Sequence, residues 1–271
     1  VCSKNNELSE NAILSGNKAT KSGGGIYMST LADWTASSLT MSGGEISQNI
    51  AGTDGGGIEV YGGGVTMTGG KISGNTAGTN GGGVDASNRF TMSGGTISDN
   101  KATTGDGGGV CQNDNSGTFT MSGGEISNNT AAGSGGGVQA GGYVFLMSDD
   151  AKISGNTATG NGGGVNVSGT YGLRIAGGAS VLNNSCNGKV NNVYLPSGET
   201  IKITDKLTGI KSIGVKVVTL PTAENNSIAF AGGYDTYLVD DNDAAAFSID
   251  GYEDDTNYNV RYGGDNLKLY Y

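Results

Sequence analysis

The sequence predicts an all-β protein: a parallel β-helix (solenoid) of about seven coils with three short strands per coil, followed by irregular β coils or a β cap. Two repeated sequence motifs predict this fold. A Met-Ser-Gly-Gly motif or a close variant starts at Met41, Met67, Met92, Met121, Met147 and Ile175. A triple glycine opens at Gly23, Gly55, Gly81, Gly107, Gly135 and Gly162. Successive copies lie roughly 25 to 32 residues apart, which is the spacing of a solenoid repeat.

Glycine dominates the composition, with 53 glycines among 271 residues and a hydrophobic fraction of only 35%. Such a composition is typical of disorder when the apolar residues are scattered. Here they recur at fixed places, so we expect residues 1–190 to form stacked β-helix repeats. The repeat motif is not continued after residue 190, and we expect residues 191–271 to form irregular coils and a β cap.

Each repeat contains three short apolar segments separated by glycine or polar turns. The first segment begins at Ile26, Ile58, Val84, Val110, Val138 and Val165. The second has apolar residues two apart, at Leu39/Met41, Val65/Met67, Phe90/Met92, Phe119/Met121, Phe145/Met147 and Leu173/Ile175. The third has one large hydrophobe, at Leu14, Ile46, Ile72, Ile97, Ile126, Ile153 and Val181. Alternation over a few residues predicts a half-buried strand, so three strands make one coil and like residues stack about 4.8 Å apart.

An asparagine follows each third segment, at Asn17, Asn49, Asn75, Asn100, Asn129, Asn156 and Asn184. Its amide can hydrogen-bond to the copies above and below, so the column predicts a structural asparagine ladder rather than a ligand site. The small residues two positions later, such as Ala131 and Cys186, are expected inside the bend, with Cys186 buried. The triple glycines suit a tight corner, and no Lys-Ser or Lys-Thr pair follows them as in a phosphate loop.

The connection between the first and second segments changes length from repeat to repeat, while the other corners stay nearly constant. Variable loops on one edge of a solenoid are where binding residues usually sit. The candidate ligand-binding residues on this edge are Asp33, Trp34, Tyr61, Tyr143 and Tyr171. Their aromatic faces would stack on sugar rings; the alternative is that large side chains simply cover an exposed corner.

Candidate catalytic groups are few. Glu59 and Asp85 fall at equivalent positions on the outward face of the first strand, and Asp149 and Asp150 replace a glycine pair in one coil. Paired carboxylates can act as acid and base on glycosides. The sequence identifies no basic residue as the partner of either pair, and the chain has no histidine. We therefore expect no enzyme activity, no metal site and no cofactor.

The formal charge is −10 with the acidic groups spread along the chain, which argues against nucleic acid or an anionic membrane as a partner. No run of residues approaches the length of a membrane span, so we expect no membrane insertion in this segment. Three cysteines without a CxxC spacing do not predict a disulfide framework or a zinc site. The first residues of the chain resemble part of a repeat, and we expect the chain to be a fragment of a longer protein.

From residue 191 the sequence changes character. Short β segments are expected at Asn192–Ile203 (strand, turn, strand), Ser212–Leu220, Ser227–Ala231, Ala246–Ile249, Asn259–Tyr262 and Asn266–Tyr271. An open end of a β-helix exposes unpaired strand edges, so these segments are expected to cap it. The acidic loops among these segments could hold calcium, which stays an alternative to a purely structural role.

The repeated Gly-Gly-x-Ile-x-x-Asn wording, as at Gly123–Asn129, resembles the right-handed β-helix repeats of bacterial surface proteins. These proteins include polymorphic outer-membrane and autotransporter-like adhesins and large cell-surface proteins of gut bacteria. Asn192–Gly198 is similar to a segment that often follows such repeats. Ile-Ser-x-Asn stands here in place of the polymorphic family's Phe-x-x-Asn. The resemblance implies right-handed coils, an extracellular or cell-surface location and an adhesion or stalk function.

We therefore expect a non-catalytic, rigid adhesin or stalk that presents its variable loop edge to a host or environmental glycan or protein. One alternative is a carbohydrate-active enzyme, a polysaccharide lyase or hydrolase, on the same scaffold. Another is a self-assembling fibre subunit, in which the open start of one rod receives the end of the next. Outward ranks of Thr and Ser on the second strand, as at Thr66 and Thr68, leave ice binding as a further alternative.

Overall fold

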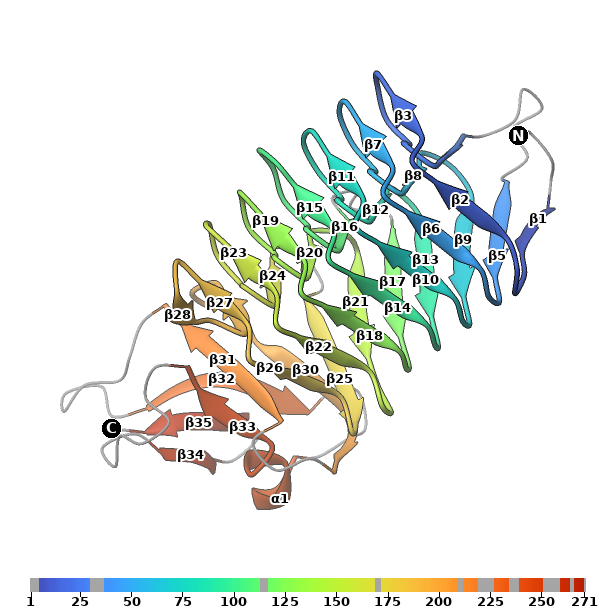
Figure 1. Cartoon of the computed structure of the whole chain (residues 1–271). Helices are drawn as coiled ribbons and strands as arrows, with labels where there is room; N and C mark the ends of the chain where they lie inside the picture. The colour runs from blue at the N-terminus through green and yellow to red at the C-terminus, as the bar shows by residue number, and fades with distance from the viewer. Residues whose placement is uncertain are drawn as a thin grey trace.

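A computed structural model describes residues 5–29, 37–112, 117–168, 172–208, 212–218, 227–233, 239–250, 259–263 and 266–270. The described chain is almost entirely β and stacks as a parallel β-solenoid of about seven turns (Figure 1). The N-terminal coils lie at one end of the rod, and the C-terminal strands with the short helix lie at the other. The predicted parallel β-helix is confirmed.

Three sheets run along the solenoid. The 11-stranded sheet is built from the second segment of each repeat. In spatial order it contains β1 (Asn5–Leu8), β5 (Ser38–Met41), β9 (Gly64–Met67), β13 (Arg89–Met92), β17 (Thr118–Met121), β21 (Val144–Met147), β25 (Leu173–Gly177), β30 (Ile201–Leu207), β32 (Ser227–Gly233), β35 (Asn266–Tyr270) and β34 (Asn259–Tyr262).

The 16-stranded sheet contains both the third and the first segments, because these two columns meet at β31 near the C-terminal end. The third-segment column is β2 (Ile13–Ser15), β6 (Glu45–Ser47), β10 (Lys71–Ser73), β14 (Thr96–Ser98), β18 (Glu125–Ser127), β22 (Lys152–Ser154), β26 (Ser180–Leu182) and β31 (Ile213–Val217). The first-segment column is β29 (Val193–Leu195), β24 (Val165–Val167), β20 (Val138–Ala140), β16 (Val110–Gln112), β12 (Val84–Ala86), β8 (Ile58–Val60) and β4 (Ile26–Met28). β33 (Phe247–Ile249) pairs with β31 off this path.

The 8-stranded sheet lies where the sequence indicated only a bend after the asparagine. Its two-residue strands are β28 (Lys189–Val190), β27 (Ser185–Cys186), β23 (Thr157–Ala158), β19 (Thr130–Ala131), β15 (Lys101–Ala102), β11 (Thr76–Ala77), β7 (Ile50–Ala51) and β3 (Lys18–Ala19). Stacking places the bends from β3 to β27 in parallel register, so their backbones pair even though each is too short to show a strand pattern in sequence. By contrast, the pairing of β28 with β27 is antiparallel.

Like residues occupy adjacent coils and fill the interior. The inward methionines of the 11-stranded sheet are fully buried register partners: Met41, Met67, Met92, Met121 and Met147. Beside them Phe119 lies between Phe90 and Phe145, with ring centroids 4.9 and 4.5 Å apart. Aligned aromatic rings add to the burial energy, so this stack strengthens the register in the middle of the rod.

The asparagine column forms a buried hydrogen-bonded ladder. Asn100 donates its backbone N–H and its Nδ2 to Asn129 Oδ1, both at 2.9 Å, and donates Nδ2 to Ile72 O at 3.0 Å. Asn75 donates its own N–H and Nδ2 to Asn100 Oδ1, again at 2.9 Å. One amide therefore ties together three successive coils. The same pattern runs through all seven predicted asparagines and continues to Asn192.

At the C-terminal end the pairing changes. β30 still stacks in parallel on β25 and pairs with β32, but β32–β35 and β35–β34 are antiparallel. The short helix α1 (Asp241–Ala244) starts at a capping box formed by Asp240 and Asp243. β strands are found within all the segments predicted after residue 191.

Asn100→Ala is expected to lower the free energy of unfolding by about 3 kcal/mol, because it leaves the Asn75 donors and Ile72 O buried without these partners. Asn17→Ala removes the same side chain at the exposed end of the ladder and is expected to cost less than about 1 kcal/mol. Urea unfolding followed by circular dichroism measures both. Equal losses would show that the buried ladder does not hold the coils together.

Candidate functional site

The variable corner predicted from the sequence is present. We call the loop edge the set of connections between first and second segments: residues 29–37, 61–63, 87–88, 113–117, 141–143 and 168–172. By contrast, the asparagine corner is the same two-residue turn in successive coils, as at 48–49, 74–75 and 99–100. Chain length therefore varies most at the loop edge, from two residues at 87–88 to nine at 29–37, while the other corners change by about one residue.

Two of the predicted ligand-binding residues lie exposed on the loop edge. Tyr61 is 68% exposed and Tyr143 is 44% exposed. Their backbones are fixed by the preceding coil, since Tyr61 N donates to Met28 O and Tyr143 N donates to Gly117 O, both at 2.8 Å. The other three candidates, Asp33, Trp34 and Tyr171, lie outside the described residues.

The spacing of the two tyrosines follows from the coil count. Tyr61 leads into β9 and Tyr143 leads into β21, and these strands are three steps apart in the order β9-β13-β17-β21. At about 4.8 Å per step, the two corners are about 14 Å apart along the rod. Tyr61 and Tyr143 thus form a pair of aromatic groups on one rigid edge.

A second chemically distinctive feature is the polar column on the outward face of the first segments. Its register partners along the rod are Tyr27, Glu59, Asp85, Cys111, Gln139 and Asn166. Glu59 and Asp85 are adjacent, as the sequence predicts. Gln139 Oε1 accepts from Asn166 Nδ2 at 2.8 Å, so two neighbouring amides of the column pair with each other. The column continues at Tyr194, the next register partner of Asn166.

Alternation assigns this column to the solvent side, yet Glu59 is only 6% exposed and Cys111 is fully buried. The reason is that each triple-glycine corner folds back against the strand that follows it. A Cβ added to Gly55 would lie 2.7 Å from Glu59 Cα, and one added to Gly107 would lie 2.6 Å from Cys111 Cα. Both glycines also have positive φ, 63° and 67°, which disfavours any side chain there.

Burial changes the protonation of the column. It raises the pKa of Glu59 to about 8, with the Asp85 and Asp54 carboxylates adding to the effect. It also raises the pKa of Asp85 to about 7, with a further rise from Asp54 and an opposing hydrogen bond from Cys111. The pKa of the Cys111 thiol is raised for the same reason, burial first and nearby carboxylates second. Glu59 Oε2 is buried without a hydrogen-bond partner, which suits a protonated, neutral carboxyl.

A second side-chain ladder runs beside the column and was missed from the sequence. Asp54 Oδ1 accepts from Thr79 Oγ1 (2.8 Å) and Asn80 N (3.0 Å), and Asn80 Oδ1 accepts from Asp106 N (2.9 Å). Asp106 Oδ1 then accepts from Ser134 N at 2.6 Å. The signal was available: the residue before every triple glycine is Ser, Asp or Asn, each with an oxygen that can cap a backbone N–H.

The chemistry that this column can perform is the holding of protons. Within the described ranges, no group of three or more His, Cys, Asp or Glu is placed to hold a metal ion. Burial and the neighbouring carboxylates raise the pKa values of Glu59 and Asp85, so this pair can hold a proton near neutral pH. Among the same described residues, no helix is long and apolar enough to cross a membrane.

The prediction that Cys186 is buried is wrong. Cys186 does continue the small column, as the register partner of Ala158, but it is only half-buried. The chain turns back after β27, so β28 pairs with it antiparallel and no further parallel coil covers the residue. Asp149, from the second acidic pair, adopts a positive φ of 50° in place of a glycine.

Comparison with models of known protein families, with curated proteins and with solved structures found no match for this chain.

The raised pKa values predict that stability falls as pH rises. Each group binds its proton more tightly in the folded chain, so its contribution is fully present below about pH 4 and is lost towards pH 8. Glu59→Gln removes the titration and is expected to be more stable than the wild type at pH 8 by on the order of 2–4 kcal/mol, with little difference at pH 4. Urea unfolding across this range measures it, with Glu7→Gln at an exposed carboxylate as the control. Parallel pH profiles for wild type and Glu59→Gln would contradict the prediction.

The two described cysteines are expected to differ in reactivity. In a Cys2→Ser background, iodoacetamide should alkylate half-buried Cys186 in the folded protein, faster above pH 9 because its pKa is raised. Fully buried Cys111 should stay unmodified until urea unfolds the chain. Peptide mass spectrometry distinguishes the sites. Modification of Cys111 without unfolding would mean that the glycine corner opens.

Proposed function

We propose that this chain is an extracellular, non-catalytic surface module, a rigid rod that presents its loop edge to a glycan or protein ligand. The observation that carries the proposal is the exposure of Tyr61 and Tyr143 on the edge whose loops vary most in length. The inward aromatic residues, such as Phe119, are buried in the core instead.

Tyrosine suits a binding edge because it offers a large flat surface with a polar tip and few rotatable bonds. The ladder fixes the coils that carry both rings, so a ligand that spans them would not have to order the protein first. A separation of about 14 Å suits an extended chain, such as an oligosaccharide lying along the rod. The resemblance to repeats of bacterial surface proteins supports an extracellular or cell-surface location.

A carbohydrate-active enzyme is the second candidate, and the Glu59–Asp85 pair favours it, because a carboxyl with a raised pKa can act as a general acid. Glu59 lies under the glycine corner and is almost inaccessible, which supports a structural role more than a catalytic one. Incubation with acidic polysaccharides separates the candidates: new reducing ends or unsaturated products that disappear in Glu59→Gln would favour the enzyme.

Binding is expected to depend on both loop-edge tyrosines. A glycan array and a panel of extracellular-matrix proteins identify a ligand; Tyr61→Ala and Tyr143→Ala should then each weaken its Kd about tenfold. Tyr262→Ala is the matched control, since Tyr262 is also 44% exposed but lies on β34 at the C-terminal end. No binding by the wild type, or an equal loss in Tyr262→Ala, would reject the proposal.

A further inference from the structure

The terminal strands are arranged differently at the two ends of the rod. The outermost strands at the N-terminal end are β1, β2, β3 and β4, each the last member of its column. Figure 1 shows β1, β2 and β3 at the N-terminal end of the solenoid, and β4 is the terminal strand of the first-segment column beside β8. At the opposite end, antiparallel strands and α1 follow the last parallel coils.

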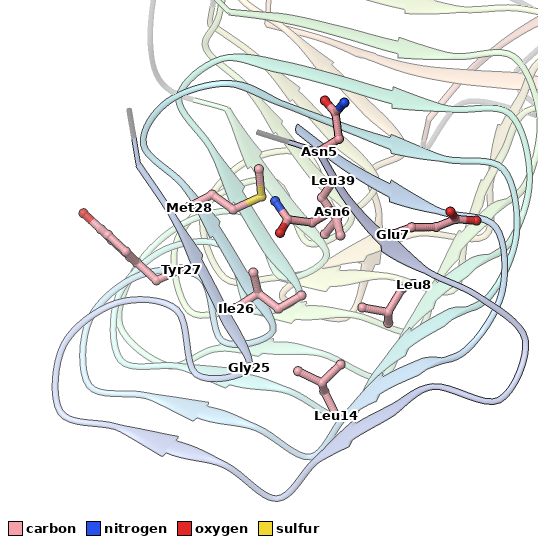
Figure 2. A pocket seen from close by; sticks show the side chains of 10 residues that line it. All are labelled: Asn5, Asn6, Glu7, Leu8, Leu14, Gly25, Ile26, Tyr27, Met28 and Leu39. Carbon is pink, nitrogen blue, oxygen red and sulfur yellow. The ribbon is translucent and has the colours of Figure 1, made fainter. Parts of the chain in front are cut away.

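The open end encloses an apolar hollow of about 500 Å³ (Figure 2). Leu8, Leu14, Ile26, Met28 and Leu39 line it and point inward. The polar residues Asn5, Asn6 and Glu7 of β1 complete this side of the lining. Exposed strand edges around an apolar mouth are the structural requirement for adding another strand layer.

Comparison with the next coil shows what is missing. Leu14 and Ile26 are half-buried, whereas their register partners Ile46 and Ile58 are fully buried. Among the strands that the structure describes, the first coil thus has a neighbouring coil on one side only. A further layer would bury these side chains as the second coil buries its own.

The polarity of the asparagine ladder specifies what that layer must carry. Each asparagine Oδ1 accepts from the N–H and Nδ2 of the preceding coil, as Asn49 Oδ1 accepts from Asn17 at 2.9 Å for both bonds. Asn17 is the first member and is exposed, and no described residue donates to its Oδ1. The acceptor end of the ladder is therefore open.

The donor end of the ladder is closed. Asn184 donates to Asn192 Oδ1, and Asn192 donates its Nδ2 to Asp250 Oδ1 at 2.8 Å and its N–H to Asp250 Oδ2. Asp250 is fully buried and lies directly after β33. A carboxylate only accepts hydrogen bonds, so it ends a row of donors.

We propose that the open face of the first coil is a docking surface for one further parallel coil of the same repeat type, with an asparagine in the ladder position. That coil would donate its N–H and Nδ2 to Asn17 Oδ1 and place its apolar side chains over the hollow. A second copy of this chain does not meet the requirement. Its far end has already given its donors to Asp250, and its near end would bring a second acceptor against Asn17.

The test is to join a copy of residues 64–88, one complete coil, directly to Asn5. Hydrogen–deuterium exchange of residues 5–28 should slow about tenfold or more relative to the original chain. A matched fusion with Asn75→Ala in the copied coil alone should give much weaker protection. Unchanged exchange at 5–28, or equal protection by both copies, would overturn the proposal. Exchange at residues 96–167 shows in each case that the rod itself is folded.

A second measurement does not depend on protection by the copied coil alone. Asn17→Ala should accelerate exchange at residues 5–28 about tenfold in the fused chain, where Asn17 would be an interior ladder member, and only slightly in the original chain. The original chain is also examined at rising concentration by sedimentation. End-to-end association that protects residues 5–28 would identify a second copy as the occupant and overturn the proposal.

Discussion

The hydrogen-bonded asparagine ladder is the constraint on which the rest of the structure depends. Hydrophobic stacking alone holds a solenoid together but tolerates sliding, because one aliphatic side chain packs on another in several positions. The amide of Asn100 has no such freedom, since it must reach Ile72 in one coil and Asn129 in the next. A slip of one residue would leave these buried groups unpaired and would turn every strand over.

The burial of the acidic column is a consequence of that register. When the coils are locked, the triple-glycine corners stack so closely that a Cβ on Gly136 would meet Gly163 O at 2.4 Å. Backbone therefore occupies the space beside the outward face of the first segments, and Glu59, Cys111, Gln139 and Asn166 are buried there, whereas Tyr27 at the first coil stays 51% exposed. Most positions tolerate this, since Gln139 and Asn166 pair with each other, but Glu59 and Asp85 can do so only by retaining protons.

Repetition explains how much of the fold was readable from the sequence. Met67, Met92 and Met121 share one place in the repeat, so any stacked arrangement must superpose them, and it does. The burial of Glu59 was not readable, because alternation reports only which face of its own strand a residue occupies. That face is covered by the glycine corner that precedes the strand. The contact depends on the backbone conformation of the corner, which alternation does not report. No repeat motif covers β32 and β35, so the sequence predicts the two strands but not their antiparallel pairing.

The same reasoning explains why binding belongs on the loop edge and not on the other corners. At the asparagine turn, a changed length would break the ladder; at the glycine corner, almost any side chain would collide with the neighbouring backbone. The loop edge is bound by neither condition, so its loops differ in length and can carry large side chains such as Tyr61 and Tyr143. The coil repeat then sets the pitch at which such side chains are offered, in steps of about 4.8 Å. In a rod of this kind, the coils that carry an aromatic residue on the loop edge set the spacing of the rings, and that spacing determines which ligand fits. The backbone of the coils between the rings stays the same.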